Sequence, residues 1–161
     1  MMRAASRAPR CAAWLALALL AAGLPACAAA AAPARVEVTE AWVRATVEGQ
    51  SGSGAYMRLR SREDARLVGA SSPVADKVEI HEMRVVDDRM TMRRIESLAL
   101  PAHTTVALER GLHVMLIGLH RALQPGQTVP LTLHLRDASG AAFDVGLAAP
   151  VRPLNTPLGR D

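Results

Sequence analysis

Apolar and polar residues alternate along most of the chain from residue 35 onward. The stretches RVEVTEAWVRATV, AYMRLR, KVEIHEM, TTVALE, TVPLTLHL and AAFDVGLAAPV all show this period of two. Alternate side chains of a half-buried strand face the core, so the pattern predicts β-strands. Segments rich in Gly, Pro, Asp and Ser separate the stretches, among them EGQSGSG, SREDA and LQPGQ. Many short strands with such turns predict an all-β sandwich or barrel.

Helical periodicity is not sustained anywhere in the same region. The segment SSPVADKVEI is expected to hold a helical turn at most, and no internal repeat occurs. We therefore expect one β-sandwich domain over residues 35–152, because a segment of roughly this length is enough for a real core. The polar, Pro-containing residues 153–161 are expected to form a flexible tail.

The first 30 residues have the composition of a secretory signal peptide. Three arginines precede the apolar run of residues 12–24, and a small-residue stretch follows it. The run is shorter than the roughly 20 residues that a membrane-spanning helix needs. We therefore expect residues 1–30 to be cleaved, and the mature protein to lie in the periplasm without a membrane span. An uncleaved anchor is the alternative, and the LPAC sequence resembles a lipobox that would attach lipid to Cys27.

Loss of the leader changes the charge balance. It removes three arginines from 19 basic residues and leaves 16 against 15 acidic residues, a net charge of about +1. The chain has no basic stripe interleaved with aromatics, and aromatics make up only 2% of it. Nucleic acid is therefore not an expected partner.

Both cysteines, Cys11 and Cys27, lie in the leader. A domain cleaved after Cys27 has no thiol, which excludes disulfides, cysteine nucleophiles and cysteine-based zinc or iron–sulfur sites. A blue-copper centre is excluded as well, because it needs a cysteine thiolate. Any metal site in this domain must use other donors.

The stretch HEMRVVDDRMTM predicts a β-hairpin with an unusual content of methionine. By parity, His81 and Met83 share one face of its first strand. Met90 and Met92 likewise share one face of the return strand. If the hairpin register holds, we expect these four side chains to converge near one end of the sheet.

A second His-x-Met pair lies in the stretch GLHVMLIGL. His113 and Met115 point to one face of the predicted strand, and the alternating residues Val114 and Leu116 point to the other. Imidazole nitrogen and thioether sulfur are neutral donors, and soft thioethers favour Cu(I). Two histidines and two methionines would complete a four-coordinate site for a soft monovalent ion.

Packing is the alternative explanation, because methionine often fills irregular gaps in cores. The other histidines, His103, His120 and His134, are expected at the surface or in satisfied positions. An enzymatic function is not expected. The chain has neither a nucleophile elbow nor an H-E-x-x-H motif, and four protein ligands leave no open position for a substrate.

From Trp42 to Val151 the chain resembles the periplasmic PCu(A)C copper chaperone family. Matching stretches include AWVRAT, GAYMRL, RLVGASSPVADKVEIHEM, MTMRRIESLALPAH and LERGLHVMLIGLHRALQPGQTVPLTL. The family's motif is His-x10-Met-x21-His-x-Met. In this chain ten residues separate His81 from Met92, while twenty separate Met92 from His113, one fewer than usual.

The resemblance implies a cupredoxin-like Greek-key β-sandwich that lacks the blue-copper cysteine. It also implies that Cu(I) is bound by four side chains, those of His81, Met92, His113 and Met115. Met83 and Met90 would be auxiliary donors. The shortened spacing leaves open whether Met90 or Met92 takes the ligand position.

The resemblance implies a function as well. PCu(A)C proteins deliver copper to the CuA site of cytochrome c oxidase, often beside a Sco-type copper protein. The CuA-bearing subunit and a Sco-type protein are therefore expected partners. Two alternatives stay open, a structural or interaction β-sandwich with a methionine patch, and a copper-tolerance protein without a delivery role.

Overall fold

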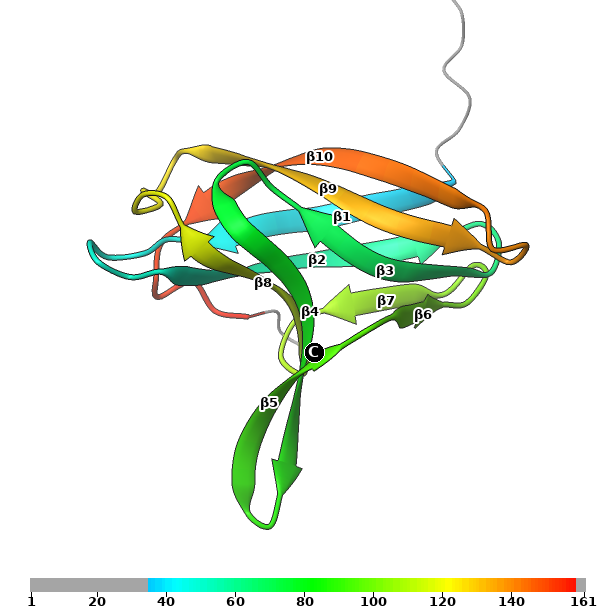
Figure 1. Cartoon of the computed structure of the whole chain (residues 1–161), viewed down its shortest axis with the longest axis horizontal. Helices are drawn as coiled ribbons and strands as arrows, with labels where there is room; N and C mark the ends of the chain where they lie inside the picture. The colour runs from blue at the N-terminus through cyan, green and yellow to red at the C-terminus, as the bar shows by residue number, and fades with distance from the viewer. Residues whose placement is uncertain (1–34, 159–161) are drawn as a thin grey trace, which may run out of the picture. The chain divides into compact units, whose positions relative to one another are not determined.

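The computed structural model describes residues 35–158, and this range consists of β-strands and the turns between them (Figure 1). The strands in it are β1 (Val36–Arg44), β2 (Gly52–Ser61), β3 (Ala65–Ser71), β4 (Ala75–Val86), β5 (Arg89–Ile95), β6 (Leu98–Leu100), β7 (Thr105–Leu108), β8 (Leu112–Leu119), β9 (Thr128–Asp137) and β10 (Ala142–Arg152). Residues 35–158 contain no helix that could span a bilayer. The predicted signal peptide and Cys27 lie outside the described residues.

The strands pair in two antiparallel groups that meet along one parallel pair. The first group runs in the order β5-β4-β8-β2-β1, with β7 also paired to β2. The second group runs in the order β10-β9-β3-β6. Strands β1 and β10 join the groups, and there Val43 lies opposite Val151. Neighbours so far apart in sequence require the crossed connections of a β-sandwich, and the predicted all-β fold is confirmed.

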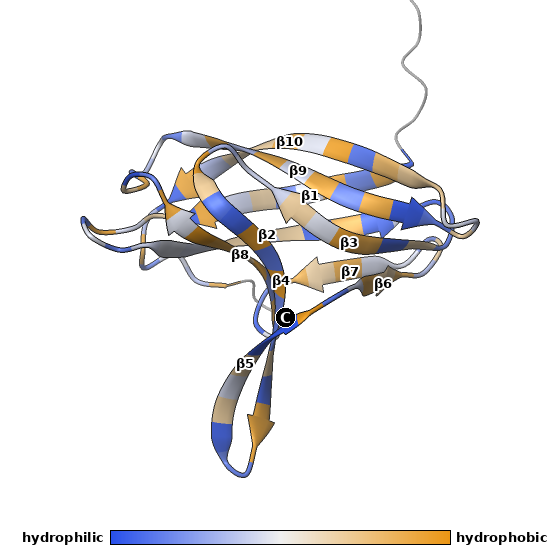
Figure 2. Ribbon diagram, in the orientation of Figure 1, coloured by the Kyte–Doolittle hydropathy of each residue, from blue (hydrophilic) through white to orange (hydrophobic). Residues whose placement is uncertain are grey.

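The core draws side chains from both groups and follows the alternation in the sequence. Along β9, every second residue from Val129 to Leu135 is at most 2% exposed. On β8, Val114 and Leu116 are fully buried, while Met115 between them points to the opposite face. Figure 2 shows apolar and polar residues alternating along β9 and β4. Strands β8 and β9 therefore each direct one apolar face into the core, whereas β5 is exposed at all of its residues except Ile95.

Two local features bear on the expectations. The segment expected to hold a helical turn at most contains a turn at residues 73–74, after which β4 begins at Ala75. The structure contains a strand that the sequence pattern did not predict, β3. A bulge between Leu67 and Gly69 interrupts its period of two.

Residues 153–158, the first part of the expected flexible tail, stay against the domain. Arg44 Nη1 donates a hydrogen bond to the Leu154 carbonyl oxygen at 3.0 Å. The backbone N–H of Thr156 donates to the carbonyl oxygen of Pro153 at 3.0 Å. Leu158 lines the pocket that is described below. This part of the tail therefore packs on the sandwich.

Strands β4 and β5 form a long hairpin that projects from the rest of the domain (Figure 1). At its tip, Asp87 and Asp88 have φ values of 50° and 57°, as in the two-residue type I′ turn that suits hairpin twist. Aspartate tolerates this left-handed region better than most residues do. The turn sets the register, which places Met83 opposite Met92.

Candidate metal site

The two predicted His-x-Met pairs lie on neighbouring strands. Strands β4 and β8 pair antiparallel, with His81 directly opposite His113. The centroids of the two imidazole rings are 5.9 Å apart. Two residues along, Glu79 lies opposite Met115. One register of pairing thus brings both histidines and Met115 together from distant parts of the sequence.

The hairpin adds methionines to this group. Met83 on β4 lies opposite Met92 on β5, and it shares the face of His81 because strand side chains alternate. Met83 is half-buried, whereas Met92 is 48% exposed. Met90 lies two residues nearer the tip, opposite Val85, and is 72% exposed. Met92, not Met90, is therefore the β5 methionine nearer the histidines.

A pocket of about 210 Å³ lies beside these side chains. The predicted residues that line it are Met83, Met92, His113 and Met115. His81 does not line the pocket itself, but its ring lies next to that of His113. Met90 stands apart from the pocket. The structure thus places four of the six predicted residues in the lining of one pocket and His81 next to one of them.

Strand β2 contributes residues that sequence reasoning missed. Gly52 and Gly54 line the pocket, and Gly54 lies opposite Met115. A Cβ atom at Gly54 would lie 2.6 Å from Tyr56 Oη, and one at Gly52 would lie 3.1 Å from Met115 Cε. The Tyr56 ring can therefore lie over Gly54 of its own strand, and Met115 of β8 can approach Gly52, because neither glycine carries a side chain. Glycines at alternate strand positions were the available signal.

An aromatic pair lies beside His113, with Tyr56 in the lining of the pocket and Trp42 behind it. The Tyr56 ring centroid is 6.1 Å from that of His113, and Trp42 packs on Tyr56 at 4.6 Å. The Arg44 guanidinium lies 5.6 Å from the Trp42 ring centroid and 5.5 Å from that of Tyr56, within the range of cation–π contacts. Under this cluster, His113 is only 5% exposed.

The burial of His113 affects its protonation. Burial lowers the pKa of His113 below the ordinary value of 6.5, and the charge of His81 lowers it further. Metal binds the neutral form of imidazole. His113 is therefore held in its metal-binding form at neutral pH.

His81 contacts a carboxylate on its own strand. Glu79 Oε2 lies 3.0 Å from His81 Nε2, and the two side chains are 20% and 14% exposed. This hydrogen bond is the largest cause of a lowered pKa at Glu79, and the charge of Arg94 also lowers it. The other ring nitrogen of His81, Nδ1, is buried and has no hydrogen-bond partner among the residues that the structure describes. Sequence reasoning missed Glu79, although its position two residues before His81 places it on the same face.

The predicted donors gathered here are imidazole nitrogens and thioether sulfurs, while the Glu109 carboxylate that also lines the pocket pairs with Arg58 at 2.9 Å. Within residues 35–158, no group of three or more His, Cys, Asp or Glu side chains is arranged to hold a metal. Hard cations such as Ca²⁺ and Mg²⁺ require several oxygen ligands. A mixed set of histidine and methionine instead suits a soft ion of low charge.

A protein-family model described as "Putative lipoprotein LpqE-like" matches residues 36–147. The chain belongs to the LpqE-like family. A curated relative, "Putative lipoprotein Lxx21020" of Leifsonia xyli subsp. xyli, is 33% identical to it over 106 residues. The match covers 65% of the LpqE-like chain and 64% of that relative, so the chain spans less than two thirds of the relative's length.

Solved structures similar to the LpqE-like chain include PCuAC domains. The copper-bound PCuAC domain from PmoF2 matches with a TM-score of 0.59 and 22% identity, covering 76% of this chain and 96% of that domain. The solution structure of CuI-DR1885 from Deinococcus radiodurans matches with a TM-score of 0.53 and 33% identity, covering 78% and 83%. The predicted β-sandwich fold and the resemblance to PCu(A)C proteins are confirmed.

The other described histidines of the LpqE-like chain lie away from the pocket. His120 Nε2 is 3.0 Å from Asp76 Oδ1, and His134 Nδ1 is 2.8 Å from Asp144 Oδ1. His103 is exposed in a turn with a φ of 58°. All three match the expectation of surface or satisfied positions.

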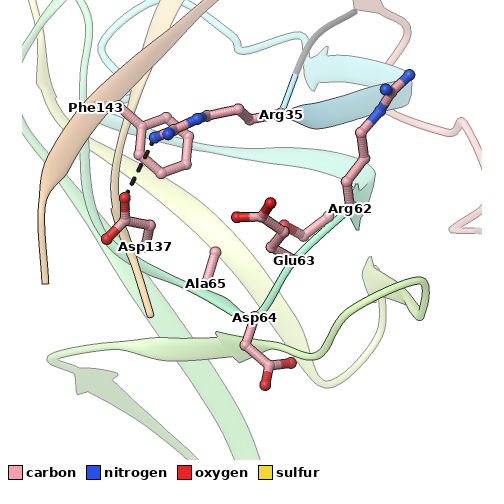
Figure 3. A pocket seen from close by; sticks show the side chains of 8 residues that line it. Arg35, Arg62, Glu63, Asp64, Ala65, Asp137 and Phe143 are labelled. Carbon is pink, nitrogen blue, oxygen red and sulfur yellow. Dashed lines mark hydrogen bonds and ion pairs between the residues drawn. The ribbon is translucent and has the colours of Figure 1, made fainter. Parts of the chain in front are cut away.

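A second, smaller hollow lies beside the start of β1 (Figure 3). It has a volume of about 60 Å³. Arg35 lies over the Phe143 ring at 5.3 Å, and its Nη1 atom is 3.3 Å from Asp137 Oδ2. Within the described part of the chain, charged and small residues and Phe143 line this hollow, and no histidine or methionine does. Its lining therefore does not resemble the predicted donor set.

Acid should destabilise the metal-free LpqE-like protein partly through His113. The pKa of His113 is lowered in the folded state. As the pH falls, His113 is therefore protonated in the unfolded chain at a higher pH than in the folded protein. The free energy of unfolding should then fall by up to about 1.4 kcal/mol per pH unit below the ordinary histidine pKa. Urea unfolding between about pH 7.5 and 5.5 should show a smaller pH slope in the His113→Gln variant. Equal slopes would contradict the lowered pKa.

Proposed function

We propose that this LpqE-like protein is a periplasmic copper chaperone. In this proposal, one Cu(I) ion is bound by His81, Met92, His113 and Met115. The supporting observation is a pocket lined by three methionines and His113, whose ring lies next to that of His81, a ring with a buried Nδ1 that has no hydrogen-bond partner among residues 35–158. A buried acceptor without a partner is costly, and thioethers have no hydrogen to donate to it. The copper-bound structures of similar domains support the choice of ion.

The chemistry of the donor set favours reversible binding. Every proposed ligand is neutral, so the four ligands add no formal charge to that of the ion. Thioethers have no proton to lose, and only the two imidazoles compete with protons for the metal. Soft thioethers retain Cu(I) well but lack the charge of a thiolate. Such a site can release its ion to an acceptor with stronger donors.

Transfer would begin on the hairpin side of the site. Met92 is 48% exposed, whereas His113 is 5% exposed. An incoming ligand can therefore replace Met92 first, while His113 still holds the ion. The proposed acceptor is the CuA-bearing subunit of cytochrome c oxidase, with a Sco-type protein as a further partner, as the family resemblance implies.

Two other functions remain candidates. Val85, Val86 and Met90 are more than half exposed on the projecting hairpin. This exposed apolar patch supports the second candidate, an interaction domain that binds another protein and needs no copper. A copper-tolerance protein would bind Cu(I) but would not load CuA.

A competition titration followed by a transfer assay separates these functions. The protein should take up a single Cu(I) from a chromophoric chelator and then load an isolated, copper-free CuA domain. Binding without transfer to CuA would overturn the delivery role and favour copper tolerance. Failure to compete with the chelator would overturn the copper site and favour the interaction domain.

Replacing Met92 by leucine should weaken Cu(I) binding, whereas replacing Met90 by leucine should not. Leucine keeps the apolar volume and removes the sulfur. Loss of a ligand should cost at least about 10-fold in affinity, because even outer partners of metal ligands contribute about 10–100-fold. Chelator competition on Met92→Leu and Met90→Leu measures both effects. The reverse order would assign the β5 ligand to Met90.

Export is a further part of the proposal, and its route can be tested at Cys27. The word lipoprotein in the names of the family and the relative supports a secreted or lipid-anchored protein. With simple cleavage, wild type and Cys27→Ser should both enter the aqueous phase after detergent phase separation. A lipid anchor at Cys27 would instead place the wild type in the detergent phase and release the variant.

A further inference from the structure

Glu79 stands among the proposed copper ligands without being one of them. It shares a face of β4 with His81 and lies opposite Met115 on β8. Its Oε2 atom is 3.0 Å from His81 Nε2, and its Oε1 atom is 3.5 Å from Arg94 Nη1. Both oxygens of the carboxylate are therefore engaged, one by the ring and one by the guanidinium.

The contact with Glu79 determines which nitrogen of His81 carries hydrogen. An ionised carboxylate only accepts hydrogen bonds, so the Nε2 atom that faces it must be an N–H group. In a neutral imidazole the other nitrogen then holds the free lone pair. That nitrogen, Nδ1, is buried and has no hydrogen-bond partner in the described part of the chain. Its ring lies next to that of His113, with centroids 5.9 Å apart.

We propose that Glu79 is a positioning residue that holds His81 in the Nε2–H tautomer, so that Nδ1 is the nitrogen that binds metal. The metal-binding half of this inference rests on the proposed copper site, whereas the tautomer is a property of the metal-free protein. A carboxylate that accepts the second N–H of a metal-bound histidine fixes the ring and increases its basicity. Glu79 is suited to that role by its place on the same strand.

Arg94 extends this arrangement to the hairpin. It lies on β5 opposite His81, and it shares a face of that strand with Met92 because the two are two residues apart. Its contact with Glu79 links the strand that carries Met92 to the carboxylate that orients His81. The link joins two proposed ligands that come from different strands.

Glu82 provides a matched control for Glu79. Both glutamates lie on β4, and their side chains are 22% and 20% exposed. Glu82 pairs with Arg84 and Arg93, and neither contact involves a proposed ligand. Glu82→Ala therefore removes an ordinary ion-pair cluster from the other face of the same strand, and it should leave the copper site intact.

The test is a long-range ¹H–¹⁵N correlation spectrum of the histidine rings, recorded without metal at a pH where they are neutral. The His81 signals are assigned by their loss in a His81→Gln variant. We expect His81 to be the Nε2–H tautomer in wild type and in Glu82→Ala. Glu79→Ala should show a mixture of both tautomers. Glu79→Gln, whose amide oxygen still accepts a hydrogen bond, should retain more of the Nε2–H form. Backbone amide spectra confirm that each variant is folded.

Addition of Cu(I) tests the second half of the inference. In wild type the ion should shift the Nδ1 resonance and leave Nε2 protonated, and Glu79→Ala should bind about 10–100-fold more weakly. An Nδ1–H tautomer in the metal-free wild type, or an unchanged tautomer in Glu79→Ala, would overturn the role of Glu79. A shift at Nε2 would overturn the assignment of Nδ1 as the ligand atom. Absence of any Cu(I) effect would overturn the proposed function, while the metal-free spectra would still report on Glu79.

Discussion

A protein in which His113 and Met115 are both replaced by alanine should bind Cu(I) more than about 100-fold more weakly than the wild type. The reason is that two of the four proposed donors are lost, whereas loss of an outer partner alone costs about 10–100-fold. Both side chains line the pocket on the face of β8 that turns away from Val114 and Leu116. The β-sandwich should therefore remain folded, as circular dichroism and backbone amide spectra can show. Chelator competition measures the affinity.

The double variant His120→Ala, Met90→Ala is the matched control. It removes the same two kinds of side chain from positions that do not line the pocket. Its Cu(I) affinity should equal that of the wild type. Wild-type affinity in His113→Ala, Met115→Ala would instead remove β8 from the copper site.

Replacing Leu116 by alanine should lower the stability of the fold and leave Cu(I) affinity unchanged, although Leu116 is next to Met115 in sequence. Its side chain is fully buried in the core. Truncation of such a leucine lowers the free energy of unfolding by about 2–5 kcal/mol, through lost burial and the cavity that remains. The donors on the other face of β8 are untouched, so the folded protein should bind Cu(I) as the wild type does. Urea unfolding and chelator competition measure the two effects.

Leu154→Ala is the control for this variant, since Leu154 is 44% exposed and lies after β10. It should change the free energy of unfolding by no more than about 0.5 kcal/mol. Saturating Cu(I) should raise the unfolding midpoint of Leu116→Ala, because an ion that binds only the folded state stabilises it. Equal stability of Leu116→Ala and Leu154→Ala would contradict the placement of Leu116 in the core.

The alternation of residue types was sufficient to predict much of the fold. In GLHVMLIGL it separates Val114 and Leu116, which are buried in the core, from His113 and Met115, which line the pocket. The hairpin could also be predicted from the sequence. A two-residue turn at Asp87–Asp88 implies the pairing of Met83 with Met92 that the structure contains. Local spacing carries this information because both features depend on residues close in sequence.

Features that depend on pairing between distant strands could not be predicted from the sequence. The position of His81 opposite His113 depends on the register between β4 and β8, which packing of the whole sandwich determines. The bulge between Leu67 and Gly69 shifts the period of two within β3 and conceals that strand. The role proposed for Glu79 depends on the orientation of one ring, which spacing alone does not specify.

X-ray absorption spectroscopy at the copper edge of the Cu(I)-loaded protein tests the proposed copper site most directly. It reports the number and type of donor atoms around the ion. The proposed ligands predict two sulfur donors, from Met92 and Met115, and two nitrogen donors, from His81 and His113. A copper site with fewer than two sulfur donors would contradict this ligand set.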